Sequence, residues 1–352
     1  MNKTIDLFAG AGLMTEGFRQ AGFRSIFAAE SDARAVASFN RNLDSVAKTW
    51  DVRNVVEGLA ADVIVAGPPC QGFSSLGKMD SNDFRNKLSL SVLDWIRSAN
   101  PKIAVIENVP QFVESKYWRA VERAARKLGY ESVVWKLNAL DFGAPQNRLR
   151  VFCILSKIGL PQKPEATVAR AVTVREAFKG LSKTPSIKMQ HVAPVPVGVA
   201  AERIRLIPRN GDKRDLLREA PHLCPPSWAK MGAQATDVWG RMKFDAPANT
   251  LRCSFQNASK GRYIHPTENR VITLREGARL QGVPDDWVFE GDRSSIARQI
   301  GNGVPIPLAK AVAEAIYKTM AGGQQAQLAL CRKVRVTHSR RGESADGAAD
   351  GG

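Results

Sequence analysis

Short apolar runs that alternate with helical periods are the feature that most constrains the fold of this chain. Residues 62–67, "DVIVAG", and 102–109, "KIAVIENV", are almost entirely apolar, which is typical of strands buried on both faces of a parallel sheet. Four further strand-like runs extend the series: "TIDLF", "RSIFAAE", "ESVVWKLNA" and "RVFCILSK". Helical periods separate them, including "LMTEGFRQAG", which Gly22 closes, and "DARAVASFNRN", for which Asp32 is a candidate N-cap. This alternation predicts an α/β fold with a doubly wound, mostly parallel sheet.

The periodicity changes along the chain in a way that indicates a second, smaller domain. With 352 residues, the chain is long enough for two domains. The regular alternation covers residues 1–156. Residues 157–265 are rich in Pro, Lys and Ala and show weak periodicity, so we expect a smaller, irregular domain there. Helical patterns over 266–321 predict a return to the first domain, and we expect 322–352 to be a disordered tail.

The formal net charge of +17 indicates a polyanionic partner, of which nucleic acid is the simplest. The basic stretch near the C-terminus, "CRKVRVTHSRR", holds only five of the 51 Lys and Arg residues and does not explain the excess. A generally basic proteome is the alternative explanation. No run approaches the roughly 18 apolar residues of a membrane span, and the N-terminus "MNKTIDLFAG" lacks the apolar segment of a signal peptide. We therefore expect a cytoplasmic protein.

The cysteines and histidines do not form a metal-binding pattern. The five cysteines are scattered, none forms a Cys-x-x-Cys pair, and the four histidines are equally dispersed. We therefore expect reduced thiols, and we expect neither a zinc site nor another metal site.

The N-terminal stretch "DLFAGAG" is a candidate cofactor-binding turn. It places a strand directly before a Gly-rich turn, where Gly10 and Gly12 allow the backbone to approach a ligand closely. Glu30 ends the second expected strand, where an acidic side chain can bind ribose hydroxyls, and Asp51 lies near the end of a third. The spacing is FxGxG rather than the GxGxxG that wraps a pyrophosphate, which favours a nucleoside cofactor without phosphates. A tight turn after a buried strand is the alternative.

A single cysteine stands in the stiff stretch "GPPC", directly after an apolar strand. Pro68 and Pro69 fix the backbone before Cys70, which suits a nucleophilic thiol because misplacement of a nucleophile lowers the rate steeply. Gly72 and the small residues after it would allow the next segment to move as a lid. An inert cysteine at the end of a buried strand is the alternative.

A carboxylate and guanidinium groups are expected at the same edge of the sheet. Glu107 ends an apolar strand that should run parallel to the one before Cys70. Gln146, Arg148 and Arg150 alternate just before a further strand, so their side chains point to one face. Together these groups predict a covalent-catalysis site beside the cofactor turn. A Cys–His hydrolase is the competing chemistry, but all four histidines come after residue 190.

These motifs, in this order, resemble those of the DNA (cytosine-5)-methyltransferases of the bacterial restriction–modification type. "DLFAGAG" resembles the motif that binds S-adenosylmethionine, "GPPCQGFS" the Pro-Cys nucleophile motif, and "ENV" the motif of the catalytic glutamate. "DFRNKL" resembles the segment that closes a mobile loop, and "QNRLR" the Gln-x-Arg-x-Arg motif. "RVITLREGARLQGVPDDW" and "QIGNGVPIPLAKAVAEAI" are similar to the family's last two motifs. The resemblance covers nearly all of the chain before residue 322.

The resemblance implies the Rossmann-like fold of S-adenosylmethionine-dependent methyltransferases, with S-adenosylmethionine as the cofactor. Residues 1–156 and 266–321 would form the catalytic domain, and 157–265 the target-recognition domain. The implied cofactor-binding residues are Phe8, Ala9, Gly10, Gly12, Leu13, Glu30, Asp51, Pro69, Leu88, Asn302 and Val304. Many relatives carry a bulky residue after the ribose-binding acid, whereas this chain has Ser31, which argues against adenine stacking at that position.

The implied activity is methylation of cytosine at C5 by base flipping and covalent addition. Cys70 would add to C6, Glu107 would hydrogen-bond N3 and Arg150 would hold O2, while Arg148 or Arg150 would favour the thiolate. The base must leave the duplex to react. The loop from Gln71 to Asn86 is therefore implied as a lid over the flipped nucleotide.

The implied partner is double-stranded DNA with a short specific sequence. Thr250 and Leu251 resemble the Thr-aliphatic pair of the family's recognition domains. The candidate DNA-contacting residues are Gln71, Ser74, Thr250, Arg252, Gln256, Asn257, Lys260, Arg262, Arg209, Lys213 and Arg214. A solvated basic surface is the alternative for each. We expect a monomer associated with the nucleoid of a bacterium or encoded by a phage, with a cognate restriction endonuclease acting separately.

Three other functions fit parts of the sequence. The first is an RNA methyltransferase on the same scaffold, but its tRNA-directed branch carries Cys-Phe-Thr where the nearest text here is "RCSFQ". The second is a non-catalytic DNA-binding relative, against which the intact Cys70, Glu107 and Arg150 argue. The third, an adenine amino-methyltransferase, would need Asp/Asn-Pro-Pro-Tyr/Phe where this chain has "GPPC".

Overall fold

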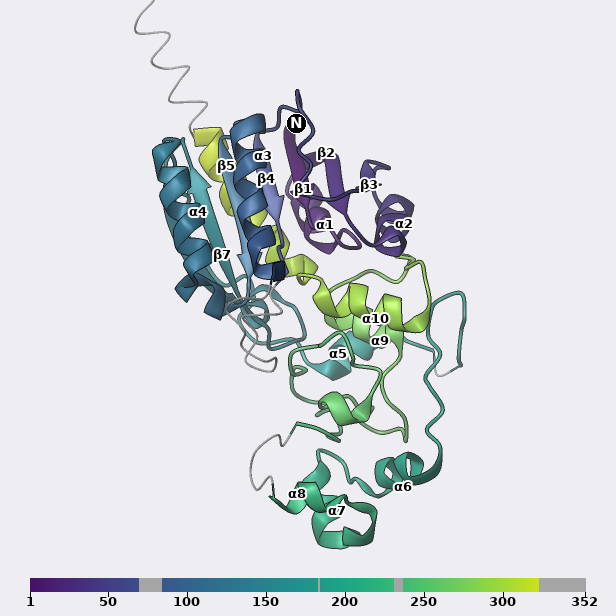
Figure 1. Ribbon diagram of the computed structural model, residues 1–352. Helices are drawn as coiled ribbons and strands as arrows, with labels where there is room; N and C mark the ends of the chain where they lie inside the picture. The colour runs from purple at the N-terminus through teal and green to yellow at the C-terminus, as the bar shows by residue number, and fades with distance from the viewer. Residues whose placement is uncertain (70–83, 183, 231–236, 323–352) are drawn as a thin grey trace, which may run out of the picture.

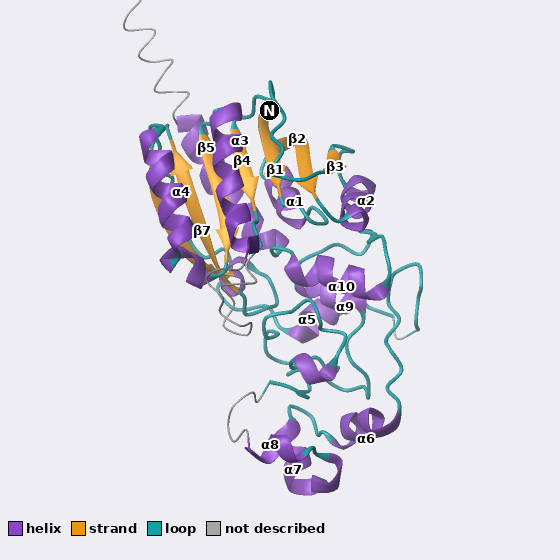
Figure 2. Ribbon diagram, in the orientation of Figure 1, coloured by secondary structure: helices purple, strands orange, loops and turns teal. Residues whose placement is uncertain are grey.

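The computed structural model describes residues 1–69, 84–182, 184–230 and 237–322 (Figure 1). Its centre is a seven-stranded sheet with the order β3-β2-β1-β4-β5-β7-β6. The strands are β1 (Asn2–Leu7), β2 (Phe23–Glu30), β3 (Ala47–Thr49), β4 (Val63–Ala66), β5 (Ile103–Asn108), β6 (Glu131–Asn138) and β7 (Leu149–Ser156). The predicted doubly wound α/β fold is confirmed, because the strand order runs outward from β1 and β4 and helices cover both faces (Figure 2).

Helices account for most of the remaining regular structure. The α-helices are α1 (Leu13–Gln20), α2 (Ala33–Asn42), α3 (Val92–Ala99), α4 (Lys116–Lys127), α5 (Val174–Phe178), α6 (Gly198–Leu206), α7 (Lys213–Glu219), α8 (Pro226–Lys230), α9 (Leu274–Leu280) and α10 (Arg293–Asn302), followed by a helix over 306–322. Short 3-10 helices are η1 (Phe84–Ser91), η2 (Pro110–Glu114), η3 (Ala139–Phe142), η4 (Pro221–Leu223) and η5 (Ala258–Lys260). Within the described ranges, no helix combines the length and the apolar content needed to cross a bilayer.

The sheet is mostly parallel, as predicted, but one strand is reversed. Strands β1 to β5 pair in parallel, whereas β7 pairs antiparallel with both β5 and β6. Val151, near the start of β7, therefore pairs with Asn108 at the end of β5. This reversal brings the residues that begin β7 to the edge where the parallel strands end.

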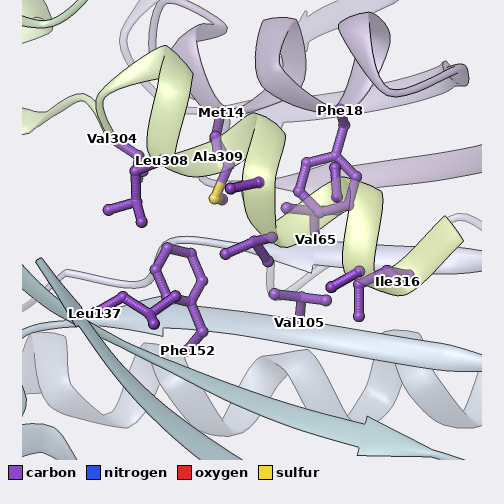
Figure 3. Packing of buried hydrophobic residues seen from close by; sticks show 14 of the residues in the cluster. Met14, Phe18, Val65, Val105, Leu137, Phe152, Val304, Leu308, Ala309 and Ile316 are labelled. Atoms are coloured by element: carbon purple, nitrogen blue, oxygen red, sulfur yellow. The ribbon is translucent and has the colours of Figure 1, made fainter. Parts of the chain in front are cut away.

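The strands are buried on both faces, which accounts for their continuous apolar runs. Ile64 and Val65 of β4 are adjacent in the chain, and their side chains enter two different hydrophobic cores. Ile64 packs with α3 and α4, whereas Val65 packs with α1 and the helix over 306–322. Figure 3 shows the second core, where Phe18 and Ile316 meet the strands. Each such aliphatic side chain, fully buried, contributes about 1.5–3 kcal/mol.

Two helices on the cofactor side begin for different physical reasons. Asp32 caps α2 as predicted, because its side chain accepts a hydrogen bond from the backbone N of Arg34 at 2.9 Å. α1 begins after Gly12, which has a φ of 86° and no side-chain cap. A Cβ at Gly12 would lie 2.6 Å from Cδ1 of Leu43 and 2.8 Å from Cδ2 of Phe39. The second glycine of the FxGxG turn is thus required both by its backbone conformation and by packing.

The region predicted to be irregular, 157–265, consists of short helices and long connections in the part of it that the structure describes (Figure 1). Its own small core contains Ile204, Ile207, Leu216, Trp228, Trp239, Ala258 and Ile264. A larger core joins Leu251 and Phe255 of this region to α9, α10 and Leu13. The region therefore packs only partly as a separate unit. Of the expected tail, residues 323–352 lie outside the described residues, and residue 322, the last residue described, is helical.

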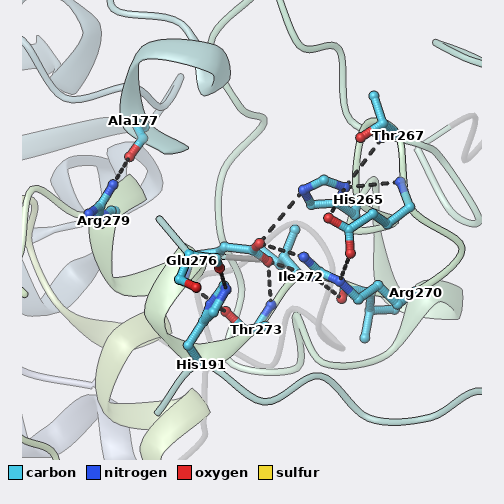
Figure 4. Close-up of polar contacts among 12 residues, drawn as sticks. Ala177, His191, His265, Thr267, Arg270, Ile272, Thr273, Glu276 and Arg279 are labelled. Atoms are coloured by element: carbon cyan, nitrogen blue, oxygen red, sulfur yellow. Dashed lines mark hydrogen bonds and ion pairs between the residues drawn. The ribbon is translucent and has the colours of Figure 1, made fainter. Parts of the chain in front are cut away.

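Buried polar contacts join this region to α9 (Figure 4). Glu276, in the first turn of α9, accepts hydrogen bonds from Arg270 and from the backbone N of Thr273, each at 2.7 Å. The hydroxyl of Thr273 lies 2.9 Å from Nδ1 of His191, and Nε2 of His265 lies 3.6 Å from Glu276. Burial lowers the pKa of His265 to about 4. Both histidines thus belong to the packing, and the described residues contain no group of His, Cys, Asp and Glu able to hold a metal.

Candidate active site

An ion pair between Glu107 and Arg150 forms the centre of the candidate site. Oε1 of Glu107 lies 2.9 Å from Nε of Arg150, and the two side chains are only 12% and 14% exposed. Burial raises the pKa of Glu107, while the charges of Arg150 and Arg148 oppose that shift. The carboxyl group therefore keeps a proton to higher pH than an exposed glutamate does.

The backbone that leads to the predicted nucleophile, Cys70, passes close to the carboxyl group of Glu107. Three predicted site residues fall outside the described part of the chain: Cys70, Gln71 and Ser74. Pro69, the last described residue before them, follows β4, and β4 is adjacent to β5. A Cβ at Gly67, between β4 and the prolines, would lie 3.7 Å from Oε2 of Glu107. The backbone three residues before Cys70 is thus close to the Glu107 carboxylate.

Asn108 holds the turn that leads to Cys70. Its Nδ2 donates to the carbonyl O of Pro68 at 3.1 Å in a buried position, and its Oδ1 accepts from the backbone N of Val109 at 2.9 Å. Both ends of the amide are therefore satisfied, and the proline turn is tied to the end of β5. Sequence reasoning does not single out Asn108, although its place directly after Glu107 at a strand end is a signal that could have identified it.

The turn after β1 leaves open space beside a carboxylate. Phe8 and Gly10 have positive φ values of 60° and 56°, and a Cβ at Gly10 would meet no atom within 4 Å. The backbone N of Gly10 donates to Oε2 of Glu30 at 2.9 Å, and the backbone N of Asp32 donates to Oε1 at 2.9 Å. Ala9, between Phe8 and Gly10, is buried. An acidic side chain held at both oxygens beside an open glycine turn fits the ribose of a nucleoside cofactor.

The remaining predicted cofactor residues come from separate segments. Asp51 follows β3, and hydrogen bonds from Arg53 hold the pKa of Asp51 at about 2. Leu88 lies in η1 and packs against the core of α3 and α4. Asn302 ends α10 and is exposed, whereas Val304 is buried in the core of the helix over 306–322.

Asp6 is a buried carboxyl group on β1 that sequence reasoning missed. The side chain is 1% exposed and accepts a hydrogen bond from the hydroxyl of Thr15. Its Oδ1 has no hydrogen-bond partner among the residues described. Burial raises the pKa of Asp6 to about 7, and the charge of Glu30 adds to the shift. Its place between the apolar residues Ile5 and Leu7, near the end of a strand, is the signal that could have identified it.

Arg148 and Gln146 join the sheet to residues 157–265, here called the recognition region after its predicted role. The buried Arg148 donates from Nη1 to the carbonyl O of Leu251 at 2.8 Å and from Nη2 to that of Gly301 at 2.9 Å. The buried Gln146 accepts from the backbone N of Leu251 at 2.7 Å and donates to the carbonyl O of Leu280 at 3.0 Å. Arg148 is also a predicted catalytic residue, and that role stays a prediction. In the structure its guanidinium group satisfies two buried carbonyls, so it bridges two segments that are far apart in the chain.

A pocket of about 280 Å³ lies where β7 meets the recognition region. Its lining residues are Asn147, Leu149, Asp237, Asn249, Thr250, Arg252, Gly261, Arg262 and Tyr263. The hydroxyl of Thr250 donates to the carbonyl O of Asn147 at 2.7 Å, and the hydroxyl of Tyr263 donates to the carbonyl O of Thr250 at 3.0 Å. Thr250 and Arg252 are predicted to contact DNA. They border the pocket together with Asn147 and Leu149, which precede Arg150 in the chain.

Three of the predicted DNA-contacting residues have side chains that are engaged inside the protein. Lys213 is fully buried. Arg262 is 11% exposed and donates to Asp212 at 2.8 Å and to three backbone carbonyls. Gln256 donates to the carbonyl O of Ile272 at 2.7 Å and accepts from Arg293 at 2.9 Å. Breaking these contacts to reach a phosphate would leave buried polar groups without partners.

The other predicted DNA-contacting residues of the described chain are accessible. Arg209, Asn257 and Lys260 are exposed. Arg214 is 61% exposed, although it pairs with Asp212 at 2.7 Å. The half-buried Arg252 donates to the carbonyl O of Lys260 at 2.9 Å.

Known proteins share both the sequence pattern and the fold of this chain. The family described as C-5 cytosine-specific DNA methylase matches residues 2–318. The type II methyltransferase M.DdeI of Desulfomicrobium norvegicum is 30% identical over 89% of this chain and 88% of its own length. M.PspPI of Psychrobacter sp. is 32% identical, with 90% and 79% covered. A solved E. coli prophage protein, described as a DNA modification methyltransferase, has a TM-score of 0.67 at 26% identity, covering 91% of this chain and all of that one.

Proposed function

This chain belongs to the C-5 cytosine-specific DNA methylase family and is a DNA cytosine-5-methyltransferase, and we propose that it methylates cytosine within a short specific sequence of double-stranded DNA by base flipping and covalent addition. The observation that carries this proposal is the buried pair of Glu107 and Arg150. Glu107 lies on β5, which is next to the strand β4 that leads to Cys70, and Arg150 lies on β7, on the other side of β5. A proton donor, a cation and a thiol at one edge of a sheet are the groups that activation of a cytosine ring needs.

Cys70 is the proposed nucleophile, because C5 of cytosine is too weak a nucleophile to take a methyl group unaided. Addition of the thiolate forms a C–S bond at C6 and makes C5 an enamine carbon. After C5 has been methylated, C5 loses its proton, the C–S bond breaks and the thiolate leaves. The hydrogen bond between Asn108 and Pro68 supports this role, since it ties the turn before Cys70 to the strand of Glu107.

Glu107 and Arg150 are proposed to hold the flipped base. The raised pKa of Glu107 keeps its carboxyl group able to donate at N3, which offsets the charge that the ring gains when the thiolate adds. Arg150 contacts Glu107 through Nε and donates from Nη1 to the carbonyl O of Leu149 at 2.8 Å, so its Nη2 group is the proposed donor to O2. Arg148 supports the site from outside, because its charge also acts on Glu107 while its donors bind backbone carbonyls.

S-adenosylmethionine is the proposed cofactor, and it supplies an electrophilic methyl group when it is bound. Glu30 and the open turn at Gly10 would hold its ribose and the adjacent groups. Asp51, Leu88, Asn302 and Val304 would border the nucleoside and the amino-acid portions. The match between an acid held at both oxygens and an unfilled glycine turn supports this assignment.

The DNA target is proposed to lie against the pocket lined by Thr250 and Arg252, with exposed cations such as Arg209 and Lys260 on the phosphates. A base that reacts inside a closed site must leave the stack. The matched relatives are named type II methyltransferases. We therefore propose a monomer that acts in the bacterial cytoplasm at the nucleoid, and a separate endonuclease with the same target sequence.

Expression in a host without DNA methylation, followed by bisulfite sequencing, tests this function. We expect protected cytosines at one recurrent short sequence, and none in a parallel culture that expresses Cys70→Ala. Methylated tRNA together with unmethylated genomic DNA would support the RNA methyltransferase instead. Sequence-specific DNA binding without any methylation would support the non-catalytic relative.

A further inference from the structure

We propose that Cys253 is a positioning residue that orients the side chain of Asn302 toward the cofactor. Sγ of Cys253 donates to Oδ1 of Asn302 at 2.8 Å. A thiol donor selects the amide oxygen, so the Nδ2 group of Asn302 must point away from Cys253. The inference rests on the proposed role of Asn302 in binding S-adenosylmethionine.

The segment 250–253, here called the recognition segment, is packed directly against the end of α10. A Cβ at Gly301 would lie 2.6 Å from backbone atoms of Arg252 and Cys253, so glycine is needed for this approach. Arg148 binds the carbonyls of Leu251 and Gly301 with the same guanidinium group. The two backbones are therefore held together independently of Cys253, and its thiol has a fixed position relative to Asn302.

The residue that follows Asn302 packs against the helix that leaves the cofactor turn. A Cβ at Gly303 would lie 2.5 Å from Cδ2 of Leu13, the first residue of α1 and a direct neighbour of the FxGxG turn. Asn302 is exposed at this point, and its Oδ1 is held by Cys253. The amide of Asn302 therefore belongs to a segment that packs beside the turn, and its oxygen is held while its two N–H donors are directed away from Cys253. Donors held in this way lose little rotational freedom when they bind an acceptor on a ligand.

The opposite side of the recognition segment borders the pocket proposed for DNA. Thr250 and Arg252 line that pocket, and the backbone N of Arg252 donates to the hydroxyl of Tyr263 at 3.1 Å. Neighbouring residues of this segment thus point to two different sites. Arg252 lines the pocket, whereas Cys253 contacts Asn302. Cys253 would thus be a residue of the recognition region that supports cofactor binding. Neither a sequence motif nor a charged side chain indicates this role.

Three single variants test the proposal: Cys253→Ala removes the donor, Cys253→Ser keeps one, and Cys224→Ala is the matched control. Cys224 is also a partly buried thiol of the recognition region, but its Sγ lies 3.7 Å from the carbonyl O of Ala220, within its own region. The binding probe is S-adenosylhomocysteine, titrated by calorimetry into each purified full-length protein without DNA. This readout is independent of turnover.

We expect Cys253→Ala to raise the Kd for S-adenosylhomocysteine by about fivefold, the range of one hydrogen bond, and Cys253→Ser to restore it. KM for S-adenosylmethionine should rise with the Kd, whereas kcat at saturating cofactor should hold. Cys224→Ala should match the wild type in every respect. A Kd that is unchanged in Cys253→Ala would overturn the inference and leave the proposed function standing. A wild type that binds no S-adenosylhomocysteine would instead overturn the cofactor assignment.

A double-mutant cycle separates this role from simple packing. In an Asn302→Ala background, Cys253→Ala should cause no further loss of affinity, because the group that it positions is gone. Equal losses in both backgrounds would show that Cys253 acts only through packing and would overturn the proposal. Should Cys253→Ala fold poorly, Cys253→Val, which fills the space without a donor, takes its place in the same cycle, with the same two outcomes.

Discussion

Arg150 and Glu107 meet diagonally across two antiparallel strands, with Nε of Arg150 2.9 Å from Oε1 of Glu107. Arg150 lies near the start of β7 and Glu107 near the end of β5. Only antiparallel pairing brings the beginning of one strand to the end of its neighbour. The one reversed junction beside β5 thus creates the polar centre of the site.

Replacement of Glu107 by Gln is expected to lower kcat by about 10²–10⁴-fold, the usual contribution of a general acid. The amide keeps the shape of the side chain but cannot transfer a proton to N3. Single-turnover transfer of a labelled methyl group measures this, with Glu131→Gln at the exposed start of β6 as the control. Near-wild-type turnover in Glu107→Gln would remove the carboxyl group from the proposed mechanism.

Replacement of Cys70 by Ala is expected to abolish methyl transfer and to leave DNA binding intact, because only the bond to C6 is lost. Transfer of a labelled methyl group to a DNA duplex measures the activity, and a gel-shift assay on the same duplex measures DNA binding. Cys224→Ala, which changes another thiol, should retain full activity. Measurable turnover by the Cys70→Ala protein would contradict the covalent route.

Replacements of Arg148 and Arg150 by Met should have different consequences. Arg148→Met leaves the buried carbonyls of Leu251 and Gly301 without donors, which should lower the free energy of unfolding by about 2–6 kcal/mol in total. Arg150→Met should mainly lower kcat, since Arg150 is proposed to bind O2 of the base, and should raise the pKa of Glu107 further. Urea unfolding and a pH–rate profile of both variants measure this. If the Arg148→Met protein is stable but inactive, Arg148 acts in catalysis and not only in packing.

The stability of the protein should depend on Asp6 between mildly acidic and neutral pH. Burial raises its pKa from 3.8 to about 7, so the folded state holds the proton more tightly than the unfolded state does. The contribution of Asp6 is fully present below its unfolded pKa and is lost as the pH rises to about 7, by about 1.4 kcal/mol per pH unit.

The Asp6→Asn variant isolates the pH-dependent contribution of Asp6 to the free energy of unfolding, because the amide of Asn does not titrate. The difference in unfolding free energy, variant minus wild type, should increase from the unfolded pKa of 3.8 to about pH 7 and then level off. Urea titrations in buffers of equal ionic strength measure it. A difference that is independent of pH would mean that the Asp6 carboxyl group is solvated or paired.

DNA affinity should fall steeply with salt, and two exposed cations should account for part of the slope. Arg209→Ala and Lys260→Ala should each reduce the slope of log K against log[salt] by about 1, as the loss of one phosphate contact does. Fluorescence anisotropy over a salt series measures this, with Lys136→Ala on the exposed side of β6 as the control. Affinity that does not change with salt would contradict phosphate binding at this surface.

Much of the fold could be predicted because its signals are local. The apolar runs at β4 and β5, the glycine turn after β1 and the N-cap Asp32 each depend on a few adjacent residues. The reversal of β7 could not be predicted in this way. Strand direction depends on the path of the connecting chain, and β6 and β7 have the same side-chain period in either direction.

The sequence by itself determined the kind of chemistry this protein can perform: an FxGxG turn, a cysteine after two prolines, a glutamate at a strand end and an arginine before β7 were all identified from their residue types and order. Only the tertiary structure decided how similar side chains divide their roles. Arg150 pairs with Glu107, whereas Arg148 binds the carbonyls of Leu251 and Gly301, and the predicted DNA contact Lys213 is buried. The physical reason is that burial and hydrogen-bond partners come from segments far apart in the chain, and the same polar side chain acts differently when its partners lie inside the protein.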